Sequence, residues 1–103
     1  MRIIGTGSAH PQRTLTNDDL SKMMDTSDEW IRERTGISTR QVITDEHLED
    51  LAAEAAQKAL DDAGIWGKDL DYIICSNVVN EYVTPSLASI VEGKIGAVCP
   101  CVD

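Results

Sequence analysis

The stretch that decides the fold runs from residue 44 to residue 76 and reads TDEHLEDLAAEAAQKALDDAGIWGKDLDYIICS. In its first part, small and apolar residues recur three and four positions apart, which is typical of one face of an α-helix. This stripe consists of Leu48, Leu51, Ala52, Ala55, Ala59 and Ala63. We predict a helix that is capped by Thr44 and ends before Gly64. Because most of the stripe is alanine, the helix should approach its neighbour closely.

The second part of the stretch, residues 71–76, is a nearly continuous apolar run. Such a run is typical of a strand that is buried on both faces of a parallel sheet. A further helix is predicted beyond it, with Thr84 as the N-cap, Pro85 at the first helical position and an end near Lys94. Residues 97–102 then begin another strand. Helix and strand therefore alternate through this half of the chain.

The first half of the chain continues the alternation. Residues 2–5 look like a short strand that leads into Gly-Thr-Gly-Ser, although this turn lacks the third glycine of a dinucleotide-binding loop. Three elements follow: a helix over residues 16–24, a helix over residues 28–34 with Ser27 as its cap, and a strand over residues 37–43. Alternating strands and helices are typical of an α/β protein, and no change of composition suggests a domain boundary.

The chain is acidic, with a net charge of −9 and a pI of about 4.5. Nucleic acid and anionic membranes are therefore poor partners for it as a whole. No apolar run reaches the roughly 20 residues of a membrane-spanning helix, and the opening apolar stretch is too short for a signal peptide, so we expect a cytoplasmic protein. Three arginines, Arg32, Arg34 and Arg40, nevertheless fall close together. They are either an anion site or surface partners of Glu29 and Glu33.

The cysteines give no sign of a metal site or of catalysis. Cys75 stands alone, and Cys99 and Cys101 form a C-x-C pair without further cysteine or histidine nearby. Reduced, buried thiols are the preferred interpretation. The two histidines, His10 and His47, are far apart in sequence and belong to no Ser-His-Asp pattern. We therefore assign no catalytic residue and no metal ligand in this chain.

One block of sequence is specific enough to suggest a family. Residues 25–31 read Asp-Thr-Ser-Asp-Glu-Trp-Ile, and residues 34–37 read Arg-Thr-Gly-Ile. Together with the opening Ile-Gly-Thr-Gly-Ser, the Leu-Thr-Asn-Asp-Asp-Leu of residues 15–20, and the later Pro-Ser and Cys-Pro pairs, this block strongly resembles the β-ketoacyl-acyl-carrier-protein synthase III family. The motifs fall in the family's order, and the resemblance covers essentially the whole chain.

The resemblance implies a fold and the absence of an active site. The family has the thiolase fold, two similar α/β halves packed as a layered αβαβα sandwich, and residues 1–103 correspond to most of its first half. The nucleophilic cysteine of the family would lie a few residues beyond Asp103, on a helix that is missing here. Its catalytic histidine and asparagine belong to the second half, and none of the cysteines present matches the nucleophile. We therefore expect a chain that is truncated before the nucleophile helix and inactive alone.

The resemblance implies that this chain contains part of the entrance for coenzyme A. In relatives, the tryptophan that matches Trp30 stacks on the adenine, and the residues that match Thr26 and Arg34 line the same mouth. The residues themselves agree, because Trp30 and Arg34 are four apart and share a helix face. A core position is the alternative for Trp30. Thr84 matches a position where some relatives carry an aromatic that reaches the partner subunit's acyl pocket, and a helix cap is the alternative there.

By resemblance, the intact enzyme is a homodimer that takes an acyl group from coenzyme A onto its cysteine. It then condenses this group with malonyl carrier protein and initiates fatty-acid synthesis, with acyl-CoA as a substrate and no separate cofactor. The alternatives are a thiolase-fold relative that makes a polyketide, quinolone or hydroxymethylglutaryl product, and a non-catalytic truncated fragment. Because the missing helix would cover the strand at residues 71–76, this chain should expose apolar surface. It should therefore associate with the remainder of its polypeptide or with a second copy.

Overall fold

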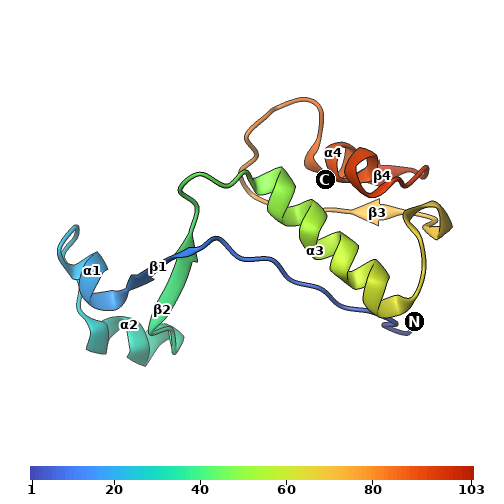
Figure 1. The fold of residues 1–103 in the computed structure, drawn as a ribbon. Coiled ribbons are helices and arrows are strands. Elements are labelled where there is room, and N and C mark those ends of the chain that lie inside the picture. Colours follow the sequence, from blue (N-terminus) through green and yellow to red (C-terminus); the bar gives the residue numbers. More distant parts are fainter. The chain divides into compact units, whose positions relative to one another are not determined.

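The computed structural model describes residues 1–103, which form two compact units, a division that no change of composition marks (Figure 1). One unit consists of residues 10–45, and the other of residues 1–9 together with residues 46–103. Strands and helices follow one another in both, as expected for an α/β chain. The elements are β1 (Arg13–Thr16), α1 (Asn17–Ser21), α2 (Asp28–Thr35), β2 (Thr39–Val42), α3 (Leu48–Ala63), a 3₁₀ turn (Gly67–Asp69), β3 (Ile73–Ile74), α4 (Leu87–Ile95) and β4 (Cys101–Val102).

In the unit of residues 10–45, β1 and β2 form a two-stranded antiparallel ribbon in which Leu15 lies opposite Arg40. The strand predicted over residues 37–43 is thus confirmed at its centre. The helix α1 follows directly after β1. The ribbon therefore places the start of α1 beside residues 36–38, which connect α2 to β2.

The start of α1 is the one predicted. The Thr16 hydroxyl accepts the Asp19 amide N–H at 3.1 Å, and the Asp19 carboxylate accepts the Thr16 amide N–H at 3.0 Å. This reciprocal pair is a capping box, which satisfies two amides that the helix itself leaves free. The helix is shorter than the predicted 16–24, because the amides of Met23 and Met24 both turn to the carbonyl of Leu20 and close the last turn.

The start of α3 differs from the prediction. Thr44 is not its cap: the N-cap position is His47, whose side chain makes no capping bond to the helix. The Leu48 amide instead donates to the carboxylate of Glu81 at 3.0 Å, and the other oxygen of that carboxylate lies 3.1 Å from His47 Nδ1. A cap from a residue so far along the chain leaves no local pattern. The end of α3 is as predicted, with Gly64 in the left-handed region at φ 70°.

The pair of His47 and Glu81 makes the start of α3 sensitive to pH. The hydrogen bond to Glu81 raises the pKa of His47, while the Leu48 amide and then His47 lower the pKa of Glu81. The histidine contribution is present below its unfolded pKa of about 6.5 and is lost as pH rises through the folded value. The glutamate contribution is present above about pH 4.3 and is lost as pH falls through its folded value. The pair therefore stabilises α3 most between these two limits.

We predict that Glu81→Gln lowers the pKa of His47 toward its ordinary value, because the neutral amide no longer favours the imidazolium. A proton NMR titration of the His47 ring measures this directly. Glu29→Gln, which removes a carboxylate from α2 in the other unit, is the control and should leave the titration unchanged. A His47 pKa that is the same with and without the Glu81 carboxylate would show that the pair is not formed.

The start of α4 also differs from the prediction, because Ser86 rather than Thr84 is its N-cap. The Ser86 hydroxyl accepts the Ser89 amide at 3.2 Å, and the amides of the two residues after the cap donate to the Asp103 carboxylate at 2.9 and 2.7 Å. Pro85 therefore precedes the helix instead of opening it. The core of this unit lies where α3 and α4 pack together, and its buried apolar residues are Leu60, Leu87, Ala88, Val91 and Ala97.

Residues 2–5 are extended but form no strand, so that prediction is wrong (Figure 1). A strand needs a neighbouring strand for its backbone hydrogen bonds, and this segment lies along α3 instead. Residues 2–5 belong to the amino-terminal segment of residues 1–9, whose backbone is bound by side chains of α3: the Thr6 amide donates to Asp62 at 3.0 Å, and the Ser8 carbonyl accepts from the Lys58 ammonium at 3.1 Å.

The contact between this segment and α3 explains both its glycines and the alanines of the helix. A Cβ atom at Gly5 would collide with the carbonyl oxygen of Ala59 and lie 2.8 Å from Ala63 Cβ. A Cβ atom at Gly7 would collide with the carbonyl oxygen of Ala55 and lie 2.5 Å from the Ala59 amide nitrogen. The predicted close approach is therefore confirmed, and its partner is the amino-terminal segment.

The strand predicted over residues 71–76 is confirmed only at its centre, as β3, which pairs in parallel with β4. Burial on both faces is not observed, since Ile74 is 76% exposed and Tyr72 is 53% exposed. The strand β3 contacts α4 and its neighbour β4, and these contacts leave Tyr72 and Ile74 more than half exposed. An exposed apolar surface at this strand is what we expected of the chain alone.

Candidate functional site

The helix α2 carries the candidate site, and its two ends are those predicted. The Ser27 hydroxyl accepts the Trp30 amide at 3.2 Å, which caps the start of the helix. Gly36 ends it with a left-handed φ of 72°, and its amide donates to the Arg32 carbonyl at 2.9 Å. Acidic residues in the first turn and arginines in the last turn complement the helix dipole. The helix therefore forms from local signals.

Trp30 and Arg34 meet on one face of α2, as their spacing predicted. The guanidinium carbon of Arg34 lies 4.2 Å from the centroid of the Trp30 ring, which is a cation–π contact. Trp30 is 52% exposed. The alternative interpretation, in which Trp30 is a core residue, therefore does not hold in this chain. A planar aromatic ring and a planar cation are thus held together at the surface.

Thr26 lies beside this pair. It lines a hollow together with Asp25, Ser27 and Trp30, and its side chain is half-buried there. The structure therefore brings the predicted residues Thr26 and Trp30 to one hollow and stacks Arg34 on the ring. Their role as coenzyme A contacts remains a prediction.

The three arginines of the basic stretch have three different environments. Arg32 forms an ion pair with Asp28 at 2.9 Å, one helical turn earlier, so the expected surface pairing occurs but with a partner other than Glu29 or Glu33. Arg40 is bound to Asn17 and to a backbone carbonyl. Arg34 forms no ion pair and contacts the tryptophan ring. Of the three, Arg34 is therefore the arginine whose hydrogen-bond donors are not engaged by another residue of this chain.

Asn17 is the residue of this unit that the sequence did not single out. Its side chain is 1% exposed and is the largest fully buried side chain of the chain. Its sequence context, one residue after a helix cap, is typical of a solvated first turn. The burial of Asn17 has no local signal in the sequence, because its hydrogen-bond partners lie 11 to 23 positions away along the chain.

The three thiols were predicted to be reduced and buried; each is free and half-buried, so their predicted burial is only partial. Burial raises the pKa of Cys75 and of Cys99, with Asp103 and Glu92 adding to the respective effects. Cys101 Sγ lies 3.3 Å from a serine hydroxyl and 3.9 Å from the Glu92 carboxylate. No group of three or more histidine, cysteine or acidic side chains is arranged to hold a metal ion.

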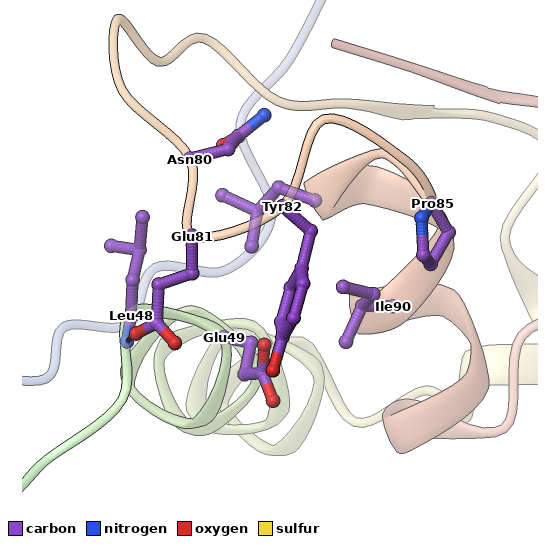
Figure 2. A pocket seen from close by; sticks show the side chains of 8 residues that line it. Leu48, Glu49, Asn80, Glu81, Tyr82, Pro85 and Ile90 are labelled. Atoms are coloured by element: carbon purple, nitrogen blue, oxygen red, sulfur yellow. Dashed lines mark hydrogen bonds between the residues drawn. The ribbon is translucent and has the colours of Figure 1, made fainter.

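A second hollow lies in the other unit, where the loop before α4 folds over the start of α3 (Figure 2). Figure 2 shows the Tyr82 side chain reaching down between Glu49 and Ile90, with Glu81 above Leu48. Thr84 belongs to this loop and is exposed. The hollow is lined by residues of this loop, of α3 and of α4.

Known proteins resemble this chain along its whole length. It is 50% identical over 102 residues to the β-ketoacyl-[acyl-carrier-protein] synthase III of Vesicomyosocius okutanii, a match that covers 99% of this chain and 32% of the relative. The crystal structure of 3-oxoacyl-[acyl-carrier-protein] synthase III from Aquifex aeolicus superposes with a TM-score of 0.87 at 38% identity, over 98% of this chain and 34% of that one. No protein-family model matches the chain.

A third similar protein, also a solved structure, comes from a polyketide pathway. The priming β-ketosynthase of the R1128 polyketide pathway superposes with a TM-score of 0.85 at 30% identity, over 98% of this chain and 31% of that one. The comparisons confirm the resemblance to ketoacyl synthase III and the thiolase-like α/β fold. The chain spans about a third of the length of the relatives it matches. No helix in it combines the length and the apolar character needed to cross a bilayer.

Proposed function

We propose that this chain is a third of a ketoacyl synthase III, a cytoplasmic homodimer that condenses an acyl-CoA starter with malonyl carrier protein in fatty-acid synthesis. The support is the similarity to synthases of this kind along 99% of the chain. The chemistry belongs to residues outside this chain, and the residues present bind and orient the substrate.

We further propose that Thr26, Trp30 and Arg34 form part of the entrance for coenzyme A. The observation that carries this proposal is the Arg34 guanidinium stacked 4.2 Å from the centre of the exposed Trp30 ring. The indole offers its free face to a flat base, and base–aromatic stacking contributes about 1–3 kcal/mol. The guanidinium has donors suited to phosphate oxygens, and no carboxylate neutralises it. The Thr26 hydroxyl, at the edge of the same hollow, can donate or accept one hydrogen bond.

We predict that Trp30→Ala and Arg34→Ala each raise the KM for acyl-CoA in the full-length enzyme. The expected cost of about 1–3 kcal/mol corresponds to roughly 5- to 150-fold for the tryptophan. The value of kcat should change less, because contacts remote from the reacting carbonyl contribute equally to the ground state and the transition state. Steady-state kinetics with acyl-CoA as the varied substrate provide both constants.

Arg32→Ala is the matched control, since Arg32 is on the same helix but is paired with Asp28. It should leave the KM for acyl-CoA within about twofold, as expected of a surface ion pair. If neither Trp30→Ala nor Arg34→Ala weakens acyl-CoA binding, the coenzyme A entrance is not on this face of α2.

The similarity to a polyketide priming β-ketosynthase supports a second candidate, a condensing enzyme that starts a polyketide chain. The two functions differ in the starter group they accept. A panel of acyl-CoA starters of increasing length and branching, assayed in turn with a fatty-acid and with a polyketide carrier protein, distinguishes them. Condensation of acetyl-CoA or short branched starters with the fatty-acid carrier protein supports the first, and efficient condensation only with the polyketide carrier protein supports the second.

A further inference from the structure

The helix α2 has little apolar packing to hold it in place. None of its eight residues is buried, and Ile31, on its inner side, is only half-buried. Burial of apolar area is the usual force that fixes a helix on its neighbours. Within this chain, contacts other than a hydrophobic core therefore fix the orientation of Trp30 and Arg34.

A single buried amide group provides that connection. The Asn17 Nδ2 group donates to the Asp28 carboxylate at 2.9 Å and to the Ile37 carbonyl at 2.8 Å. Its Oδ1 atom accepts from the Arg40 guanidinium at 2.6 Å, and Arg40 also donates to the Leu15 carbonyl at 3.3 Å. Both donors and the acceptor of the amide are therefore used, which is what a side chain that is only 1% exposed requires.

The partners of this amide lie at the two ends of the helix. Asp28 is the first residue of α2, and Ile37 follows the glycine that ends it. The backbone amide of Asn17 adds a bond to the Ser38 carbonyl at 3.2 Å. Trp30 and Arg34 lie between these two fixed points. A shift of either end would therefore move the ring and the guanidinium together.

We infer that Asn17 is a positioning residue for the coenzyme A entrance: it touches no ligand and acts by holding α2, and with it Trp30 and Arg34, in the binding orientation. This inference rests on the function proposed above. Small displacements of groups that orient a substrate can cost as much as 100-fold. A change confined to the amide of Asn17 should therefore weaken acyl-CoA binding without a direct contact being lost.

The test uses Asn17→Asp in the full-length enzyme, because aspartate has the same shape but no N–H donors. The substitution breaks the bond to the Ile37 carbonyl and places two carboxylates at the position of the bond to Asp28. We expect the KM for acyl-CoA to rise about tenfold while kcat changes less than about twofold. The KM for malonyl carrier protein should not change. Asp18→Asn, a neutralising substitution of the next residue on α1, is the control and should leave all three constants unchanged.

A double-mutant cycle separates positioning from a general loss of structure. If Asn17 acts through Trp30 and Arg34, Asn17→Asp should have little further effect on acyl-CoA binding in the enzyme that carries both Trp30→Ala and Arg34→Ala. An equal effect in both backgrounds would overturn the inference, as would an unchanged KM when Trp30→Ala alone raises it. If Trp30→Ala itself has no effect, the proposed entrance is wrong instead, so the two failures are distinguishable.

Arg40→Met replaces Asn17→Asp if the aspartate variant does not fold. Methionine keeps an apolar stem along the ribbon but cannot donate to Asn17 Oδ1, so the amide loses one of its three bonds. The expected rise in the KM for acyl-CoA is smaller, about threefold, and it should again disappear in the background that lacks both the Trp30 ring and the Arg34 guanidinium. A rise that persists there overturns the inference in the same way.

Discussion

The purified 103-residue chain should form no ketoacyl product from acetyl-CoA and malonyl carrier protein. Thioester transfer needs a thiolate, and the raised pKa values of Cys75 and Cys99 keep these thiols protonated at neutral pH. A general base beside the thiol would be the other route to activation. Neither histidine is hydrogen-bonded to a cysteine, and His47 is bound to Glu81. No thiol of this chain is therefore paired with a histidine that could act as its base.

Product formation is measured by mass spectrometry of the carrier protein, with the full-length enzyme as the positive control. A complementary test is alkylation of the cysteines of this chain in the full-length enzyme, with its own nucleophile shielded by bound acyl group. Turnover should survive this treatment, because none of Cys75, Cys99 and Cys101 takes part. Condensation by the isolated chain, or loss of turnover on alkylation of these thiols, would mean that one of them is catalytic.

A large loss of stability is expected for Gly7→Val. The segment that contains Gly7 lies so close to α3 that a Cβ atom there would be 2.5 Å from the Ala59 amide nitrogen and 2.8 Å from Lys58 Cβ. The Ala59 nitrogen and the Ala55 carbonyl oxygen, which the Cβ atom would also meet, belong to the helix backbone and cannot turn aside as a side chain can. Overpacking typically costs about 1–3 kcal/mol, and a collision with backbone should reach or exceed the upper end. Urea unfolding of the full-length polypeptide measures the free energy of unfolding.

Gly93→Ala is the matched control for this prediction. Gly93 lies within α4, is exposed, and has no atom within 4 Å of the position of its Cβ. Alanine is favoured over glycine inside a helix by about 1 kcal/mol, so this variant should be slightly more stable than the natural chain. The two substitutions should thus change the free energy of unfolding in opposite directions. A tolerated Gly7→Val would show that the amino-terminal segment does not pack on α3 as described.

Elements with complete local signals were predictable from the sequence. The helix α2 has a serine cap, acidic first turn, basic last turn and terminal glycine within ten residues, and both of its ends were found. The contact between Trp30 and Arg34 follows from their spacing on this helix. The alanines of α3 predict that some segment packs closely against this helix, but they do not predict which segment it is.

Features that depend on distant partners were not predictable. The caps of α3 and α4 are completed by Glu81 and Asp103, which lie 33 and 16 positions from the amides they accept. The distant cap of α3 explains why Thr44 was chosen wrongly, whereas at α4 the local cap is Ser86, two residues after the Thr84 that was predicted. The burial of Asn17 depends on groups brought together by the β1–β2 ribbon, and residues 2–5 would need a neighbouring strand to be a strand themselves.

The Glu81 carboxylate, which binds both the His47 ring and the Leu48 amide, also couples the evolution of positions 47 and 81. Because one side chain satisfies both the Leu48 amide and the His47 ring, a change at position 81 alters what is acceptable at position 47. A serine, threonine or aspartate at position 47 would cap the helix by itself and would free position 81 to drift. Among relatives of this chain, the two positions should therefore covary: acidic residues at 81 should accompany residues at 47 that cannot cap a helix.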